Sequence, residues 1–246
     1  MRLTDKGDWE TSQDSGEKPI GDIPFTRIFS QYLPKARAGE KVLEIGCVPG
    51  NFPAYICKKF GYKPVGVDYL KNTVKVTSET MENNGISDFE VVREDFFNWR
   101  PKEKFSIVSS FGFIEHFTNP EETVKRHVDL LDDKGTLILE VPNFKGLRNF
   151  VARIIDKDFL GKHNLDTMDL EFYRKVAREN NLEILYLGYY GGFAYFPKNN
   201  KLSIGQKLFF LPFRVFGKIF RDFPFDNKLL SSYVFFIAKK KQNNNA

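Results

Sequence analysis

The chain has 246 residues, of which 41% are hydrophobic and 28% charged, and its formal net charge is +5. These values are ordinary for one globular α/β domain with a substantial core. Two cysteines without metal-ligand spacing indicate a reduced, cytoplasmic setting, and the polar first 17 residues lack the apolar core of a signal peptide. No run of about 18 apolar residues is present, which argues against a membrane-spanning helix.

The positive charge is concentrated near the end of the chain. Residues 201–246 contain nine Lys or Arg and two acids, so this segment carries +7 and the rest of the chain about −2. At the other end, residues 1–38 are expected to form an N-terminal cap. Trp9 either docks on the domain surface or belongs to a lid over a ligand cleft. Apolar spacing predicts a helix from Asp22 to Leu33, ending at Pro34.

Residues 41–60 predict a strand, a glycine turn and a helix. The apolar Lys41-Val-Leu-Glu-Ile runs into Gly-Cys-Val-Pro-Gly50, and helix-like sequence follows from Asn51 to Phe60. A glycine turn between strand and helix lets the backbone approach a nucleotide-like ligand, and the helix offers free N–H groups at its start. Glu44 would lie at the carboxyl end of the strand. The turn lacks the G-x-G-x-x-G of a NAD site.

Residues 42–52 resemble motif I of class I S-adenosylmethionine-dependent methyltransferases, roughly E/D-x-G-x-G-x-G, with Val48 at the middle glycine. The resemblance implies a Rossmann-like α/β/α sandwich whose seven-stranded sheet is mostly parallel, with an antiparallel last strand. It implies S-adenosylmethionine as cofactor and an enzyme that methylates an acceptor. The bulkier Val48 supports the alternative of an inactive methyltransferase fold that acts as a membrane-surface or subunit-binding protein.

A second strand, Pro64 to Asp68, ends in an acid roughly 20 residues after the turn, the spacing at which an acid binds ribose hydroxyls. Tyr69 would pack against the sugar or base. A helix from Asn72 to Asn83 and a strand from Phe89 to Arg93 are predicted next. The resemblance then implies that Asp95 hydrogen-bonds the adenine amino group and that Phe96 lies against the adenine ring. The alternative is an acidic turn with core phenylalanines.

A fourth strand, 105–110, leads into Phe111-Gly-Phe-Ile-Glu-His-Phe-Thr-Asn-Pro. This stretch is similar to the S-x-G-x-x-E-H-x-x-D-P segment of small-molecule methyltransferases of the type 11 and ubiquinone-pathway kind, beside the donated methyl group. An Asn/Asp-Pro-Pro-Tyr motif is absent, which disfavours methylation of base amines. The resemblance thus implies nine cofactor-binding residues: Glu44, Gly46, Cys47, Gly50, Asp68, Tyr69, Asp95, Phe96 and Phe111.

The second half of the chain predicts alternating helices and strands, with residues 144–165 as a substrate-side insertion around a short helix at 147–155. The predicted elements are a helix at 121–131, a turn at 133–135, a strand at 136–143, a helix at 166–180 and strands at 182–190 and 231–240. Residues 197–228 form a basic, aromatic insertion before the last strand. The whole chain, 1–246, is predicted to be a single methyltransferase domain.

Methyl transfer to an oxygen acceptor needs a base, for which His116 and His163 are equal candidates, with Glu115 beside His116. The alternative is that Glu115 and His116 brace the loop after the fourth strand. His127 falls among charges in the middle of a helix and is expected at the surface. Metal-dependent relatives carry E-x-x-E-H, whose first glutamate is replaced by Gly112 here. No metal is therefore expected, and Glu115, His116 and His163 would offer only a poor site.

The expected acceptor is a small molecule, glycan or lipid-linked compound, and nucleic acid is not expected. Its pocket would be built from residues 111–117, 144–165 and 188–196, where five aromatic residues either stack on a ring or fill the core: Tyr189, Tyr190, Phe193, Tyr195 and Phe196. In the tail, Pro212 suits a first helical turn. Arg214, Lys218 and Arg221 then share one face and the phenylalanines another. Residues 208–223 would contact the inner face of a membrane, a second subunit of a homodimer, or the sheet.

Overall fold

The computed structural model describes residues 1–5, 7, 9, 20, 21, 23, 25–155, 157–193, 203–220 and 225–242. In the first half of the chain the elements are α2 (Thr26–Tyr32), β1 (Lys41–Ile45), α3 (Asn51–Phe60), β2 (Lys63–Asp68), α4 (Thr73–Asn83), β3 (Glu90–Arg93), β4 (Phe105–Phe111), the 3-10 helix η1 (Ile114–His116) and α5 (Pro120–Asp129). They are followed by β5 (Leu131–Pro142), α6 (Leu147–Ile155), α7 (Lys157–Gly161), the 3-10 helix η2 (Leu165–Met168), α8 (Leu170–Glu179), β6 (Leu182–Tyr190), α9 (Ile204–Phe220) and β7 (Tyr233–Lys240).

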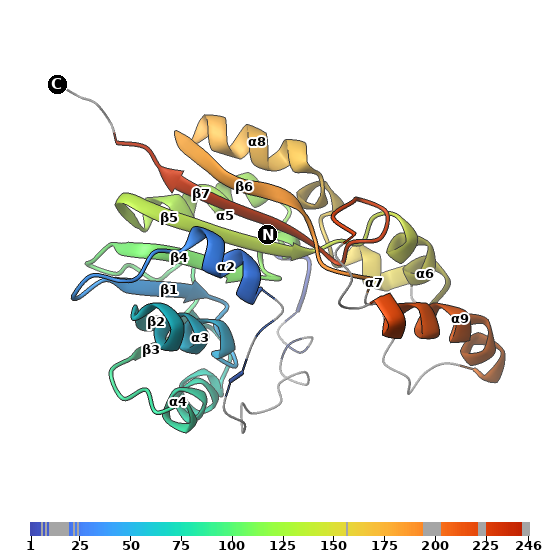
Figure 1. Ribbon diagram of the computed structural model, residues 1–246, viewed down its shortest axis with the longest axis horizontal. Helices are drawn as coiled ribbons and strands as arrows, with labels where there is room; N and C mark the ends of the chain where they lie inside the picture. The colour runs from blue at the N-terminus through green and yellow to red at the C-terminus, as the bar shows by residue number, and fades with distance from the viewer. Residues whose placement is uncertain are drawn as a thin grey trace.

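The seven strands form one sheet in the order β3-β2-β1-β4-β5-β7-β6 (Figure 1). The β1–β2, β1–β4, β2–β3 and β4–β5 ladders are parallel, whereas β7 lies antiparallel between β5 and β6. This confirms the predicted Rossmann-like sheet with its antiparallel last strand. Parallel strands are covered on both faces, which explains why β1, β2 and β4 are buried along almost their whole length.

Helices cover the sheet from both sides and bury two hydrophobic clusters. On one face α2 and α3 bring Phe29 and Ile56 against the strands. On the other face α5 and α8 contribute Val124 and Val176. The carboxyl ends of β1, β2 and β4 therefore meet at one edge of a rigid three-layer body, where loops are free to carry a site.

Three predicted helices differ from the observed ones. The helix expected at 166–180 is broken at Asp169, whose extended backbone is typical of the N-cap position that it occupies in α8; its carboxylate binds both Lys145 and Lys228. α9 begins at Ile204, so Pro212 lies inside the helix and not in its first turn. α2 begins at Thr26, later than the expected Asp22, a residue outside the described part of the chain.

The strand expected at 136–143 begins earlier, at Leu131. Its pairing with β4 is interrupted, because Phe105 faces Leu131 while Ile107 already faces Thr136. The extra residues form a bulge in which Lys134 has a φ of 65°. The predicted turn at 133–135 therefore exists as an irregularity within β5.

Candidate active site

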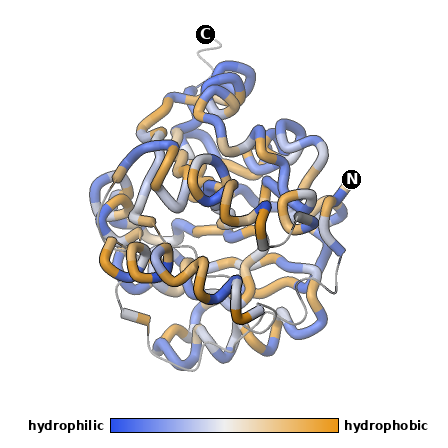
Figure 2. The backbone as a smooth tube through the Cα atoms, turned by 90° about the vertical axis from the view of Figure 1, so that its right-hand side faces the viewer, coloured by the Kyte–Doolittle hydropathy of each residue, from blue (hydrophilic) through white to orange (hydrophobic). Residues whose placement is uncertain are grey.

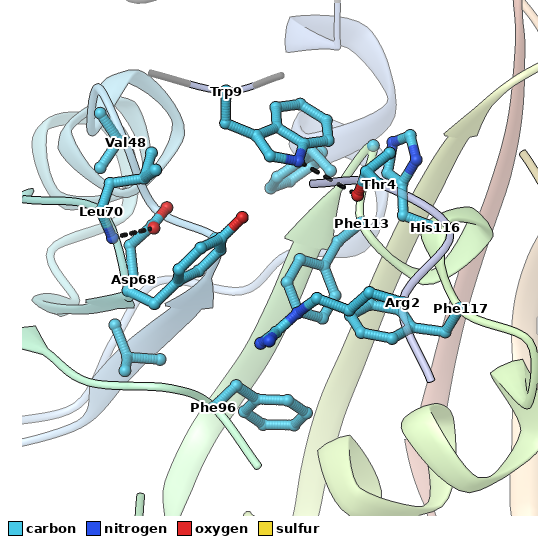
Figure 3. A pocket seen from close by; sticks show the side chains of 15 residues that line it. Arg2, Thr4, Trp9, Val48, Asp68, Leu70, Phe96, Phe113, His116 and Phe117 are labelled. Atoms are coloured by element: carbon cyan, nitrogen blue, oxygen red, sulfur yellow. Dashed lines mark hydrogen bonds between the residues drawn. The ribbon is translucent and has the colours of Figure 1, made fainter. Parts of the chain in front are cut away.

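A pocket opens at the carboxyl ends of β1, β2 and β4 and encloses about 720 Å³ of empty space that is partly continuous with solvent. In Figure 3, Asp68 and Val48 lie on one side of the pocket, His116 and Thr4 on the opposite side, and Trp9 above. The lining residues are Arg2, Thr4, Trp9, Gly46, Val48, Val67, Asp68, Tyr69, Leu70, Phe96, Phe111, Gly112, Phe113, His116 and Phe117.

The glycine turn after β1 forms one wall of this pocket. The N–H of Gly46 donates to the carbonyl of Val67 at 2.9 Å, and its φ is +73°. A Cβ at Gly46 would lie 2.9 Å from Cδ2 of Phe113, so only glycine fits without displacing that ring. Val48 also lines the pocket, and the turn leaves the cavity open.

Two other predicted residues of the turn face the protein interior. Gly50 precedes α3 with a φ of +100°, and a Cβ there would lie 2.9 Å from Cγ2 of Thr77 on α4. The Sγ of Cys47 lies 3.9 Å from Oγ1 of Thr77, and burial raises the pKa of the thiol well above its ordinary value. Neither residue lines the pocket, so both hold the turn in place through the packing of α4.

Two buried carboxylates lie at neighbouring strand ends. Asp68 lines the pocket, and its Oδ1 accepts a hydrogen bond from the N–H of Leu70 at 3.1 Å. Burial raises the pKa of Asp68, and backbone N–H groups and the charge of Arg2 offset part of this rise. Burial, followed by the charge of Asp68, raises the pKa of Glu44 well above its usual range. Its Oε2 has no hydrogen-bond partner among the described residues, so an incoming hydroxyl group would satisfy it.

Aromatic side chains complete the same side of the pocket. Phe96 is 4% exposed, and the guanidinium of Arg126 lies 5.0 Å above its ring. Tyr69 lines the pocket beside Asp68. Phe111 stacks on Phe52 with ring centroids 4.0 Å apart, so its ring is fixed where β4 ends. Flat apolar walls of this kind suit a heteroaromatic ring.

Asp95, predicted beside Phe96, lies outside the pocket lining and is engaged by the N-terminal segment. Nη2 of Arg2 donates to Oδ1 of Asp95 at 2.8 Å, and the same oxygen accepts from the N–H of Phe97 at 3.0 Å. Burial pushes the pKa of Asp95 upward, but these two hydrogen bonds outweigh it and hold the pKa below its ordinary value. Arg2 also lies 4.7 Å over the ring of Tyr69 and lines the pocket.

The N-terminal segment covers the pocket through backbone and side-chain contacts. The N–H of Leu3 donates to the carbonyl of His116 at 2.7 Å, and the N–H of Thr118 donates to that of Met1 at 3.0 Å. Nε1 of Trp9 donates to Oγ1 of Thr4 at 3.2 Å, and the Trp9 ring meets His116 edge to face at 4.8 Å. Of the two alternatives for Trp9, the structure therefore has the indole over the cleft.

The predicted catalytic residues converge on the opposite side of the pocket. Nδ1 of His116 lies 2.9 Å from the carbonyl oxygen of Lys162, and the rings of His116 and His163 are 4.8 Å apart. His163 itself does not line the pocket. Its Nδ1 lies 2.8 Å from the carbonyl oxygen of Phe159, and burial lowers the pKa of its ring.

Glu115 is buried behind His116. Its Oε1 lies 3.5 Å from Nε2 of His116, and neither carboxylate oxygen has a hydrogen bond to a described residue. Burial, reinforced by the charge of Glu140, raises the pKa of Glu115 well above its ordinary value. The N–H of Asn164 donates to the carbonyl of Glu115 at 2.6 Å, so residues 162–164 brace this loop from outside. No three His, Cys, Asp or Glu residues in the described part of the chain are grouped to hold a metal ion.

His127, expected at the surface, is fully buried under the pocket. Its Nδ1 lies 2.7 Å from the carbonyl of Thr123, and its Nε2 lies 3.1 Å from Oγ of Ser110. Burial lowers the pKa of His127 to about 4, so the ring is neutral. The prediction was wrong because His127 falls on the inward stripe of α5, three residues after Val124.

Arg2 and Thr4 line the pocket and were missed because they belong to no motif, whereas Phe113 and Phe117 fall within the predicted segment 111–117. Of the two alternatives for the aromatic residues of 188–196, the described ones follow the packing alternative and are absent from the pocket lining. The hydroxyl of Tyr189 donates to the carbonyl of Met168, Tyr190 packs on Phe235, and Phe193 meets Phe216. Tyr195 and Phe196 lie outside the described residues.

Known proteins were compared with the chain in sequence and in fold. Residues 24–187 match a family model described as a methyltransferase domain. The chain is 30% identical over 157 residues to an uncharacterized methyltransferase of Bacillus licheniformis, covering 59% of this chain and 70% of that protein. It is 23% identical over 155 residues to the mitochondrial ubiquinone biosynthesis O-methyltransferase of Dictyostelium discoideum, covering 55% of this chain but only 48% of that protein.

A crystal structure of a Bacillus halodurans methyltransferase superposes with a TM-score of 0.63 at 19% identity, covering 89% of this chain and 99% of the other. That likeness supports the fold. The family model spans about two thirds of the chain, from α2 into β6, and includes every strand end that lines the pocket. The chain therefore belongs to the methyltransferase domain family, within the class I S-adenosylmethionine-dependent methyltransferases.

Proposed function

We propose that the pocket binds S-adenosylmethionine and that the protein methylates a hydroxyl group of a small-molecule, glycan or lipid-linked acceptor. The observation that carries the acceptor proposal is His116, an imidazole in the pocket wall whose Nδ1 is bound to a backbone carbonyl. The carboxylates at one side and the imidazole at the other divide the pocket into a cofactor side and an acceptor side.

The cofactor side fits the cofactor's parts. Asp68, which lines the pocket, would accept hydrogen bonds from ribose hydroxyls. Glu44 lies outside the pocket lining, although its Oε2 has no other partner among the described residues. Gly46 would let the backbone approach the methionine portion, and Phe96 and Tyr69 would enclose the adenine. When bound, the sulfonium supplies an electrophilic methyl group without help from a metal. The protein's task is then mainly to align an acceptor with that methyl, and positioning of this kind supplies roughly 7–11 kcal/mol.

His116 is the base that the geometry favours over His163. A carbonyl oxygen only accepts hydrogen bonds, so Nδ1 of His116 carries the ring proton and the lone pair lies on Nε2. Nε2 would take the proton of the acceptor hydroxyl. Oε1 of Glu115 lies 3.5 Å from Nε2, but burial disfavours the charged carboxylate, so Glu115 would contribute packing behind the ring. His163 lies one ring further from the pocket and would orient His116 by packing.

The acceptor side suits a ring or chain with apolar surface. Trp9 meets the His116 ring edge to face, and Phe117, the next residue in the chain, also lines the pocket. The Dictyostelium relative is named for O-methylation in ubiquinone biosynthesis, and its likeness supports an oxygen acceptor here. The chain spans about half of that relative's length, so the proposal takes over the class of acceptor atom and not the relative's substrate.

The test has two stages that fail separately. Calorimetry with S-adenosylmethionine and S-adenosylhomocysteine examines the cofactor side, and absence of binding by both would overturn it. Transfer of a radiolabelled methyl group to catechols, prenylated phenols and free or lipid-linked sugars then examines the acceptor. Incorporation into amines alone would overturn the hydroxyl proposal.

The base is tested on the acceptor that is methylated. We expect His116→Gln to lower kcat by roughly 10²–10⁴-fold and to remove the acid limb of the pH–rate profile, with cofactor affinity unchanged. His163→Gln is the matched control and should retain that limb with a smaller loss. An unchanged pH profile in His116→Gln would exclude His116 as the base.

A further inference from the structure

Helix α9 stands at the outer end of the molecule, beyond the carboxyl ends of the parallel strands (Figure 1). Its inward stripe packs on the body: Phe210 is 1% exposed and Gly217 is buried. Phe216 contacts Phe193 at 5.6 Å and Phe225 at 6.2 Å between ring centroids. Phe210 and Phe216 therefore hold α9 to the domain, whereas Phe209 is 50% exposed.

A second apolar stripe runs along the outer side of α9. Its five residues follow the i, i+4, i+7, i+11, i+15 spacing of one helix face. They are the large apolar residues Ile204, Leu208, Leu211, Val215 and Ile219, exposed by 78%, 65%, 50%, 51% and 67%. Single exposed apolar residues are ordinary, but an aligned row of five is a contiguous patch that marks an interaction surface.

Three cations flank this outer stripe on one side. Lys207, Arg214 and Lys218 share a helix face that lies between the inward and outward stripes, and all three are exposed. Residues 204–220 contain no acid at all. Leu211, Arg214, Val215 and Lys218 together line a shallow groove at the boundary of the cationic and apolar stripes. Cationic groups beside apolar ones, without acids, match an anionic lipid surface.

We propose that α9 docks the protein on an anionic lipid bilayer, lying in the plane of the interface with its outer stripe among the acyl chains. Its 17 residues would extend about 25 Å along that plane. None of the described helices has the length and apolar character needed to cross a membrane. Figure 2 looks onto the end of the molecule that would face the lipid.

The charge pattern disfavours an antiparallel pairing of α9 with a second copy of the chain. In an antiparallel twofold pair of α9 helices, the same flank of each helix meets its equivalent. Lys207, Arg214 and Lys218 would then face the same three cations, a repulsion that no acid of the helix relieves. On a bilayer the three cations meet anionic headgroups instead.

Docking through α9 also has a consequence for orientation. The pocket and α9 both lie at the carboxyl-terminal edge of the parallel strands (Figure 1), so the pocket edge would be held toward the lipid. The lipid-linked class among the proposed acceptors would be reached without leaving the membrane. The docking itself is independent of the acceptor and is tested without one.

The experiment is flotation of the full chain with vesicles of equal parts phosphatidylglycerol and phosphatidylcholine, compared with phosphatidylcholine alone. We expect binding to the anionic vesicles, with at least about 10-fold weaker binding to neutral ones and salt sensitivity. Arg214→Glu/Lys218→Glu should weaken binding at least about 10-fold, and Arg214→Lys/Lys218→Arg should preserve it. Leu208→Ser/Ile219→Ser should weaken binding to a similar degree while keeping the charge.

The matched control is Val74→Ser/Lys75→Glu on α4, where an exposed apolar residue is again next to a cation. It should bind vesicles as the wild type does. Calorimetric affinity for S-adenosylhomocysteine, unchanged in every variant, shows that each is folded. Equal vesicle binding by wild type and Arg214→Glu/Lys218→Glu would overturn the proposal. So would a wild-type dimer in sedimentation that Leu208→Ser/Ile219→Ser dissociates, since the outer stripe would then be a subunit interface.

Discussion

The two sides of the pocket are held by different parts of the fold. On the cofactor side, Gly46, Asp68 and Phe111 lie at the ends of β1, β2 and β4, inside the three-layer body. On the acceptor side, Trp9 and His116 belong to the N-terminal segment and to a 3-10 helix braced by the loop at 162–164. The first side is fixed by the sheet, while the second depends on contacts between loops.

This difference separates cofactor binding, which a family can share, from acceptor specificity, which can differ between its members. Strand ends of one sheet keep their spacing whatever ligand the loops select, so the cofactor side can be shared across a family. Loops tolerate change and set specificity. If this division is right, changes at the cofactor side should act on cofactor affinity and on stability together, whereas changes at the acceptor side should act on turnover alone.

The largest effect is expected at His127, which supports the cofactor side from beneath through edge contacts with Phe96 at 5.0 Å and Phe113 at 5.9 Å. The folded chain holds this ring neutral down to a pKa of about 4, whereas the unfolded chain binds a proton below pH 6.5. The free energy of unfolding should therefore fall as the pH drops from 6.5 to 4, by up to about 3 kcal/mol from this residue. Urea unfolding across that range measures it.

Other groups also titrate in this range, so the prediction concerns a difference between proteins. His127→Gln should be less stable than wild type at pH 7 and should lose less stability between pH 6.5 and 4. The same loss in both proteins would mean that His127 is not held neutral.

The next effect is expected at Gly46. In Gly46→Ala the new Cβ meets Phe113 at 2.9 Å in a backbone conformation with a φ of +73°. Overpacking and left-handed strain together should lower the free energy of unfolding by about 3 kcal/mol. Because the displaced turn and ring also line the pocket, we expect at least about 10-fold weaker binding of S-adenosylhomocysteine in calorimetry. Gly39→Ala is the matched control, because Gly39 has a φ of +83° but no atom within 4 Å of the added Cβ. Equal affinity of the two variants would contradict a close turn at the cofactor side.

The cofactor side could be predicted from sequence because its signals are local. The turn at 46–50 is predicted by a strand that runs into glycines, and Asp68 is predicted by its spacing from that turn. Gly46 and Asp68 line the pocket, and Gly50 packs behind it. Cys47 and Gly50 were placed in the right turn, but their contacts with Thr77 come from α4, which the turn does not encode. A motif locates a backbone and leaves open which way each side chain points.

The acceptor side could be predicted only in outline. The pairing of residues 111–117 with 144–165 was expected, and His116, Lys162 and His163 lie together. The place of Arg2 in the pocket could not be predicted, because it depends on a contact with Asp95, a residue more than 90 positions away in the chain. The burial of His127 was missed because neighbouring charges suggested a surface position, although the spacing from Val124 indicated the inward stripe.

Asp68 offers a smaller effect on the same side. Asp68→Asn keeps the size and one acceptor oxygen but removes the charge that strengthens hydrogen bonds to ribose hydroxyls, so we expect about 10-fold weaker cofactor binding. Asp88→Asn is the control. Asp88 is an exposed acid whose Oδ1 lies 2.6 Å from Nζ of Lys63, and neither residue lines the pocket. A tenfold loss in Asp88→Asn would point to net charge instead of a direct contact.

The smallest effect is expected where the two sides meet, at the ion pair between Arg2 and Asp95. Both side chains are partly exposed, at 31% and 27%, so the pair contributes at most about 1 kcal/mol. Arg2 lies between Asp95 and the pocket, and Arg2→Ala would release the carboxylate for the adenine amino group. We expect cofactor affinity to rise by up to about 5-fold in calorimetry.

Arg2→Lys sharpens this last comparison. A lysine keeps the cation but not the planar fork, so it should leave part of the competition for Asp95 in place and give an intermediate affinity. If Arg2→Ala instead binds the cofactor more weakly than wild type, Arg2 supports the ligand from above. The N-terminal segment would then belong to the cofactor side, and the boundary between the sheet-held and loop-held sides would pass through His116 and not through Arg2.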